Sequence, residues 1–154
     1  MNIIQIDNTQ GALVFQLFDQ YRVFYKQPSD LQRAKNYIQE RLDNKESVIF
    51  VALSADNQTP MGFTQLYPNY SSVRTIKNWT LNDLYVHPDF RKQGVGENLI
   101  QTALAFAKQN EARFVELCTA TDNYTAQSLY EQIGFNKQAV DTEFLTYRIN
   151  VSNN

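Results

Sequence analysis

The chain has 154 residues, a length that suits one compact domain with one hydrophobic core. Its net charge of -2 and pI of about 5.4, without a basic tract, argue against nucleic-acid binding and favour a cationic small molecule. The single cysteine excludes an intramolecular disulfide, and one histidine with one cysteine argues against a zinc site of the usual type.

The first residues lack the basic region and the long apolar stretch of a secretory signal. No apolar run approaches the roughly 20 residues that span a membrane. We therefore expect a cytoplasmic protein with no membrane partner. We also expect one domain over residues 1–151, with residues 152–154 as a loose C-terminal end.

The first third of the chain predicts a short strand and two helices. Ile3–Ile6 is apolar enough for the strand. Between Gly11 and Tyr25, apolar residues recur at intervals of three and four, which is the stripe of an amphipathic helix. Ser29 or Asp30 can cap a second helix, whose apolar face would be Leu31, Ala34, Tyr37, Ile38 and Leu42.

The rest of the chain predicts a sheet with further helices. The expected strands are Ser47–Leu53, Met61–Tyr67, Trp79–Val86 and Phe114–Cys118, and the expected helices are Gly94–Gln109 and Thr125–Ile133. We expect the polar stretch Tyr70–Lys77 to be a loop, and Phe135–Ala139 with Phe144–Ile149 to close the sheet as a hairpin. This order predicts a mixed α/β (α+β) fold, a central mixed sheet with helices on both faces and one parallel strand pair.

The most informative segment runs from Leu81 to Leu99, where a strand leads through a proline turn into Arg-x-x-Gly-x-Gly and then a helix. Gly94 and Gly96 let backbone N–H groups approach a ligand closely. The unpaired amides and the dipole of the following helix favour an anion there. A Walker loop is absent, and Leu99 stands where the dinucleotide fingerprint needs its third glycine. The segment therefore predicts a different kind of phosphate site.

This segment and the one near residues 123–135 together resemble the GNAT superfamily of N-acetyltransferases. Leu81–Ala107 is similar to its acetyl-CoA motif. Asn123–Phe135 is similar to its second motif, an Asn ahead of a helix that ends in Tyr-x-x-x-Gly-Phe. The run Leu81–Val86 and the aromatic first helix loosely resemble the histone and polyamine acetyltransferase-like subgroup. The resemblance implies a GNAT-type domain that uses acetyl-CoA as cosubstrate and no metal.

The resemblance also implies which residues meet the cosubstrate. In such enzymes a bulged strand splays from its parallel neighbour, and the pantetheine arm lies in the gap. The backbone of Leu84, Tyr85 and Val86 would meet that arm, with the Leu84 N–H directed at the thioester carbonyl. A fixed donor there is worth about 3–4 kcal/mol in the transition state. The pyrophosphate would lie against the backbone of Arg91, Lys92, Gln93, Gly94, Val95 and Gly96.

Two residues of the second motif have implied roles with structural alternatives. Asn123 would hydrogen-bond the pantetheine arm, or cap its helix, or do both. Tyr130, four residues before Gly134, matches the general acid of the family and would contact the cosubstrate while protonating the departing thiolate. The alternative for Tyr130 is core packing beside Ala126.

The base is less well indicated. Asp83 is the charged residue nearest the thioester on its strand, and it would end a water relay from the amine or serve only as a structural carboxylate. Asn82 stands where polyamine-acetylating relatives often carry an acid, which weakens the case for a base at that position. His87 resembles a turn residue of the family, and Cys118 reads as a small core residue.

The resemblance places the acceptor pocket among the first two helices and the loops near the splayed strand. Tyr25, Tyr67 and Asp83 are the substrate candidates there, because aromatic rings near a carboxylate hold an alkylammonium group by cation–π and charge attraction. The alternative for most of these rings is core packing.

Three functions stay open from the sequence. The first is acetylation of a primary amine of a small molecule (a polyamine, amino acid or aminoglycoside) by direct attack in a ternary complex. The second is acetylation of protein lysines or N-termini. The third is a non-catalytic acyl-CoA-binding regulator, against which Tyr130 and the intact phosphate loop argue. The expected partners are a small-molecule amine and, from the family, a second copy in a homodimer.

Overall fold

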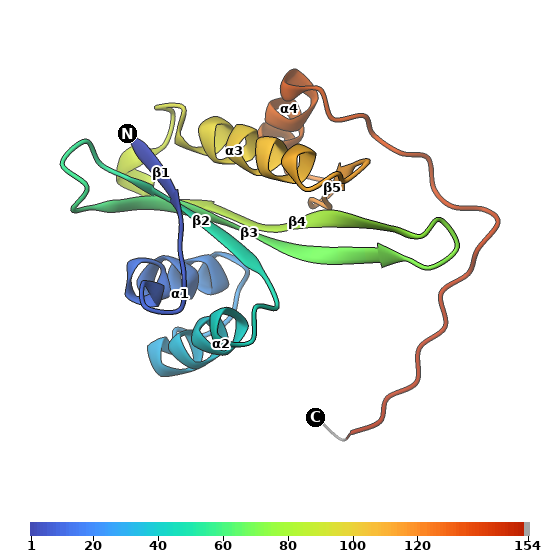
Figure 1. The fold of residues 1–154 in the computed structure, drawn as a ribbon, viewed down its shortest axis with the longest axis horizontal. Helices are drawn as coiled ribbons and strands as arrows, with labels where there is room; N and C mark the ends of the chain where they lie inside the picture. Colours follow the sequence, from blue (N-terminus) through green and yellow to red (C-terminus); the bar gives the residue numbers. More distant parts are fainter. Residues whose placement is uncertain (153–154) are drawn as a thin grey trace. The chain divides into compact units, whose positions relative to one another are not determined.

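The computed structural model describes residues 1–152 (Figure 1). They form two compact units, Met1–Cys118 and the segment from Thr119 onward. Residues 153 and 154, which belong to the expected loose end 152–154, lie outside the described residues. The expectation of one domain over residues 1–151 stays a prediction.

The first unit is built on a mixed sheet with the strand order β1-β2-β3-β4-β5. Its strands are β1 (Asn2–Gln5), β2 (Val48–Leu53), β3 (Pro60–Ser71), β4 (Ile76–Val86) and β5 (Val115–Glu116). The first four are antiparallel neighbours, and β5 runs parallel to β4. The helix α3 (Val95–Gln109) connects β4 to β5, so the strand–helix–strand step gives the parallel pair that the sequence predicts.

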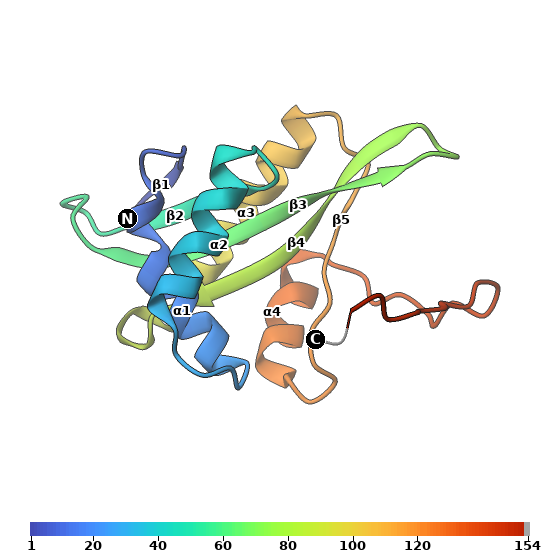
Figure 2. The ribbon, with the colours of Figure 1, turned by 90° about the horizontal axis from the view of Figure 1, so that it is seen from below.

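Helices cover both faces of this sheet, as predicted (Figures 1 and 2). A 3-10 turn (Gly11–Leu13), α1 (Phe15–Phe24) and α2 (Leu31–Asp43) lie on one face, and α3 lies on the other. Successive side chains of the central strands point to opposite faces of the sheet, so they pack in turn against α1 and α2 or against α3. Val51 and Phe63 are fully buried in the cluster with α1 and α2, whereas the Phe50 ring lies 5.7 Å from that of Phe106 in α3.

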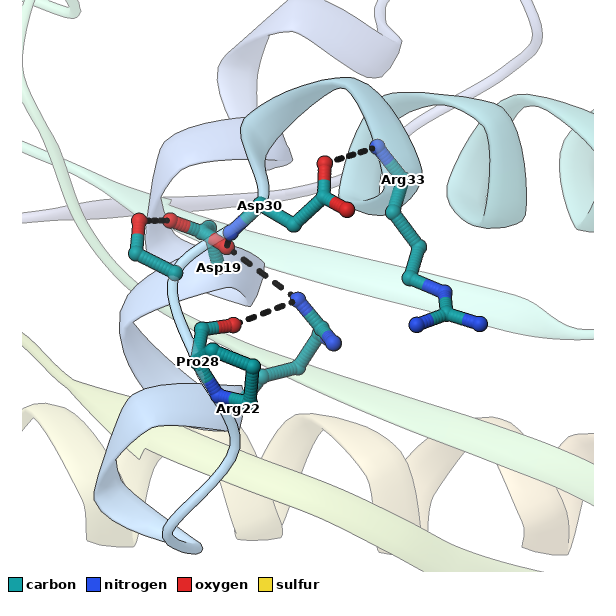
Figure 3. A network of polar contacts seen from close by, with 6 residues as sticks. Asp19, Arg22, Pro28, Asp30 and Arg33 are labelled. Carbon is teal, nitrogen blue, oxygen red and sulfur yellow. Dashed lines mark hydrogen bonds and ion pairs between the residues drawn. The ribbon is translucent and has the colours of Figure 1, made fainter.

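A buried carboxylate ties α1 to the start of α2 (Figure 3). Asp19 accepts hydrogen bonds from the Ser29 hydroxyl at 2.6 Å and the Asp30 amide at 2.8 Å, and it pairs with Arg22 at 3.3 Å. Asp30 in turn caps α2, since its carboxylate accepts from the Arg33 amide at 3.1 Å. Of the two predicted caps, Asp30 is therefore the one used.

Replacing Asp19 with Asn is expected to lower the free energy of unfolding by about 1–3 kcal/mol at neutral pH, the usual size for lost bonds to a buried charge. The hydrogen bond from Ser29 is the main reason that the pKa of Asp19 is lowered. A lowered folded-state pKa stabilises above the unfolded pKa, and this stability is lost as the pH falls through the folded value. Thermal melts should therefore show a gap between Asp19→Asn and wild type that closes in acid. Asp122→Asn, at an exposed position, is the control; an equal loss there would contradict the assignment.

The β3–β4 hairpin is longer than the sequence predicts. The prediction of a loop over Tyr70–Lys77 is wrong in part, because β3 continues to Ser71 and β4 begins at Ile76. The two strand ends satisfy each other's backbone groups, with Tyr70 opposite Lys77, so polar side chains suffice. Pro68 does not end β3. Leu66 is the last β3 residue paired with β2, so within residues 1–118 one edge of β3 is unpaired at Pro68. The backbone N–H that proline lacks therefore costs no hydrogen bond on that edge.

The second unit contains the helix α4 (Tyr124–Ile133), which the sequence predicts within one residue. It ends at Gly134, whose φ of 123° favours glycine. The predicted hairpin of Phe135–Ala139 and Phe144–Ile149 is wrong, since residues 135–152 contain no strand. Their apolar alternation has the period of a strand, but a strand also needs a neighbour for its backbone groups, and this unit offers only a helix. Cys118 is exposed, so the core reading of it is also wrong.

Candidate functional site

A β-bulge in β4 determines where the site lies. The register between β3 and β4 shifts so that Gln65 faces Asp83 and Leu66 faces Leu81, which leaves Asn82 as the extra residue. In an unbroken strand, positions 79 and 83 would share one face. Instead, the Trp79 ring packs 5.1 Å from that of Phe106 in α3, while Asp83 faces the α1 and α2 side. The bulge therefore turns one carboxylate toward the first two helices.

Asp83 opens into a cavity of about 420 Å³ between this face of the sheet and the two helices. The side chains around it are mainly aromatic and polar: Phe18, Tyr21, Arg22, Gln27, Arg33, Tyr37, Tyr67, Asn82 and Asp83. All belong to the first unit. The structure therefore brings together two of the three predicted substrate residues, Tyr67 and Asp83. Tyr25 does not line the cavity; it is 51% exposed, and its ring packs against Tyr21 at 5.0 Å.

The Asp83 carboxylate is almost completely buried, with only 3% of the residue exposed. Burial raises its pKa, and hydrogen bonds from Asn82, Gln65 and Tyr21 oppose this in part. The Asn82 side-chain nitrogen donates to one carboxylate oxygen at 2.7 Å, and Gln65 donates to the other. A fixed carboxylate with a raised pKa is a stronger base than a solvated one, which is what proton abstraction at neutral pH needs.

Two tyrosines, Tyr37 and Tyr67, line the same cavity as this carboxylate. The hydroxyls of Tyr37 and Tyr67 are 2.7 Å apart, and the guanidinium of Arg41 lies 4.4 Å from the centre of the Tyr37 ring. Burial, the bond with Tyr37 and the nearby charge of Asp83 all raise the pKa of Tyr67. The Tyr67 phenol therefore stays protonated at neutral pH, and the cavity presents hydroxyl groups and ring faces around one anionic group.

The far edge of β4 is open where the cosubstrate is expected. β5 pairs only with Trp79 and Thr80, so within residues 1–118 no strand pairs with that edge from Leu81 to Val86. This early end of the pairing is the splay that the family resemblance implies. Leu84, Tyr85 and Val86 lie on this stretch, with β3 on their other side.

The Arg-x-x-Gly-x-Gly segment follows directly and leads into α3, as the sequence predicts, while its role in binding phosphate stays a prediction. Gly94 has a φ of 82° and begins α3 with no side-chain cap, so the amides of the first helical turn keep no side-chain partner. Lys92 is also left-handed, with a φ of 61°. The Arg91 side chain donates to the Val86 carbonyl at 2.9 Å and lies 5.5 Å from the Tyr85 ring, so it fastens the loop to the end of β4 while adding positive charge. His87 accepts from the Asp89 amide at 3.2 Å, as a turn residue does.

Asn123 and Tyr130 belong to the second unit. The Asn123 side-chain oxygen accepts from the Ala126 amide at 3.2 Å, which is the capping role. Within residues 1–152 no hydrogen bond is recorded for the side-chain nitrogen of Asn123, so a pantetheine contact is compatible with the cap. Tyr130 is half-buried, and its ring lies 5.9 Å from that of Phe135. The roles of these two residues toward the cosubstrate stay predictions.

The comparisons with known proteins agree with this geometry. The profile of the Acetyltransferase (GNAT) family matches residues 13–135. The chain belongs to this family. A Bacillus subtilis (strain 168) relative, the uncharacterized N-acetyltransferase YhfO, is 45% identical over 151 residues, which is 98% of each chain.

Solved acetyltransferase structures share the fold. The crystal structure of a probable acetyltransferase is 37% identical, has a TM-score of 0.88 and is matched over the whole of both chains. The aminoglycoside N-acetyltransferase AAC(6')-Iy in complex with CoA has a TM-score of 0.77 over 96% of this chain and 93% of that one, and at 19% identity it is evidence for the fold alone. The GNAT protein described here is accordingly an acetyl-CoA-dependent N-acetyltransferase.

One part of the cavity lining could not be read from the sequence. Arg22, Gln27 and Arg33 line the cavity but carried no motif. Arg22 lies on α1, Arg33 on α2 and Gln27 between them, and only the fold brings all three to the cavity that Asp83 also lines. Among the described residues no helix is both long and apolar enough to cross a membrane. No group of three His, Cys, Asp or Glu within residues 1–152 is placed to hold a metal ion.

Proposed function

We propose that this GNAT enzyme transfers the acetyl group of acetyl-CoA directly to a primary amine of a small molecule, of the polyamine, amino-acid or aminoglycoside type. The observation that carries the proposal is the buried Asp83 in an aromatic-lined cavity of about 420 Å³. That volume lies in the range of small-molecule sites. Aromatic faces and a carboxylate are the groups that hold an alkylammonium ion.

The residues of the first unit suit the expected cosubstrate. The start of α3 suits its phosphates, because the left-handed Gly94 at its N-cap has no side chain to occupy the amides of the first turn. The open edge of β4 at Leu84, Tyr85 and Val86 offers backbone groups for the pantetheine arm. Acetyl-CoA supplies the activated acetyl group. In this proposal the Leu84 N–H donates to the thioester oxygen, where negative charge develops.

Proton transfer is assigned to two side chains. Asp83 accepts one proton from the ammonium group, directly or through water, so that the nitrogen lone pair can attack. As the N–C bond forms and the C–S bond breaks, a second proton leaves the nitrogen for solvent, and this proton balances the one that Tyr130 takes up after donating its own. Tyr130 donates a proton to the sulfur and is then reprotonated. One proton in total is released to solvent for each acetyl group transferred.

Replacing Tyr130 with Phe is expected to lower kcat by about ten- to a thousandfold while leaving acetyl-CoA affinity unchanged, the usual range for general-acid catalysis. Steady-state kinetics and calorimetry would measure the two quantities. Tyr124→Phe, at an exposed position on the same helix, is the matched control. Unchanged turnover in Tyr130→Phe would remove this hydroxyl from the mechanism.

A panel of acceptors tests the proposed function. Free-thiol release from acetyl-CoA would be measured with amino acids, polyamines, aminoglycosides and lysine-containing peptides. We expect turnover with at least one class of small amine and none above background with peptides. Turnover on peptides alone would favour the alternative, a protein lysine or N-terminal acetyltransferase. Acetyl-CoA binding without turnover on any amine would favour a regulatory acyl-CoA-binding module.

The proposal extends to a cytoplasmic homodimer with no nucleic-acid or membrane partner. The net charge of -2 without a basic tract supports the absence of nucleic acid. The homodimer follows from the family resemblance. Light scattering of the purified protein would give its mass in solution, and a monomer at micromolar concentration would refute the dimer.

A further inference from the structure

The charges around the cavity are asymmetric. Asp83 is the only carboxylate among its lining residues, and two guanidinium groups, Arg22 and Arg33, line it as well. Gln27 adds an uncharged amide between the two helices. A ligand in this cavity therefore meets one negative group and two positive ones.

Among the described residues, the Arg33 side chain has no charged partner. It is the third residue of α2, and its backbone amide donates to the Asp30 carboxylate at 3.1 Å (Figure 3). A guanidinium group offers donors in a planar fork that matches a carboxylate or a phosphate.

Arg22 is held in place and only partly neutralised. One of its terminal nitrogens contacts Asp19 at 3.3 Å and the Pro28 carbonyl at 3.5 Å. Asp19 also binds Ser29 and the Asp30 amide and does not line the cavity, so it is not available to a cationic ligand. The other N–H groups of the Arg22 guanidinium belong to a side chain that is 14% exposed, and they are available to a ligand.

We propose that the acceptor is a zwitterion, a primary amine joined by a short chain to an anionic group, either carboxylate or phosphate. This inference rests on the proposed function and narrows it. The ammonium end lies toward Asp83 and the tyrosine rings, and the anionic end lies toward Arg33 and Arg22. A polycation of the same length places its second ammonium group beside these arginines, where like charges repel.

The reaction at the amine end is the one already written, and the anionic end takes no part in it. Its contacts with the arginines are made before and during transfer alike, so they strengthen binding and raise kcat/KM mainly through KM. An amine lacking the anionic group is acetylated at the same centre with a higher KM.

A matched series of acceptors tests the inference. Butylamine, putrescine, γ-aminobutyrate and the corresponding aminoalkyl phosphate share a chain type and differ in the distal group, and shorter and longer homologues set the best length. At the best length we expect kcat/KM for the amino acid or the amino phosphate to exceed that of the diamine by about tenfold or more, the size of one charge-assisted contact. The two anionic acceptors distinguish a carboxylate from a phosphate site.

Arg33→Gln should lower the ratio of kcat/KM for the zwitterion to that for the alkylamine by about tenfold. Lys35→Gln removes the same charge from α2 at a position outside the cavity and should leave that ratio unchanged. A diamine preferred at every length, or a ratio that Arg33→Gln does not move, would overturn the inference while the proposed function stands. If acetyl-CoA binds and no amine is acetylated, both fall.

Discussion

Replacing Asp83 with Asn is expected to lower kcat by about a hundred- to ten-thousandfold, the usual contribution of general-base catalysis. The side chains are similar in size, and Gln65 and Asn82 still surround the position. The loss therefore reports the missing carboxylate. Acetyl-CoA affinity should be unchanged, because Asp83 faces the cavity beside α1 and α2 while the phosphate loop lies at the start of α3.

The pH dependence gives a second readout of the same residue. Burial raises the pKa of Asp83, so the wild-type kcat should fall in acid with an apparent pKa above the value of about 3.9 of an ordinary Asp. The base is active above its folded-state pKa and is lost as the pH falls through it. Asp83→Asn should lack this acidic limb. Asp122→Asn, at an exposed position, should keep both the rate and the limb. Full turnover in Asp83→Asn would leave Asp83 a structural role only.

Gly96→Leu is expected to weaken acetyl-CoA binding by at least about a hundredfold. Gly96 is the second residue of α3, and in the proposed site its missing side chain lets a phosphate approach the amides of the first turn. Calorimetric titration would measure the affinity, and circular dichroism would check that α3 still forms. Gln101→Leu, at an exposed position further along α3, is the control and should bind normally. Intact affinity in Gly96→Leu would refute the phosphate-loop assignment.

Local patterns predicted most of the fold. Residues close together in the sequence determine these features. They are the apolar faces of α1 and α2, the strand–helix–strand step through α3 and the glycine at the start of α3. The loop prediction over Tyr70–Lys77 was wrong in part, since pairing between two strand ends satisfies the backbone without an apolar pattern. The prediction of a final hairpin was wrong for the opposite reason. The apolar pattern alternates as in a strand, but the described part of this unit offers no strand to pair with.

The site was predicted in part. Tyr67 and Asp83 were identified through the family resemblance, and the structure places both at one cavity. The bulge at Asn82 that turns Asp83 toward α1 and α2 depends on the register with β3, which no local pattern gives. Arg22 and Arg33 lie on different helices, and only the packing of α1 against α2 brings them to the same cavity.

A single-turnover experiment with isotopically labelled acetyl-CoA tests the central proposal most directly. The enzyme in excess over labelled acetyl-CoA would be mixed with the best small amine of the panel, and the amine, CoA and protein would be separated and analysed by mass spectrometry. We expect the label on the amine nitrogen, one free CoA thiol for each acetyl group transferred, and no labelled protein at any time. Label that stays on CoA, or that appears first on the protein, would contradict direct transfer to a small amine.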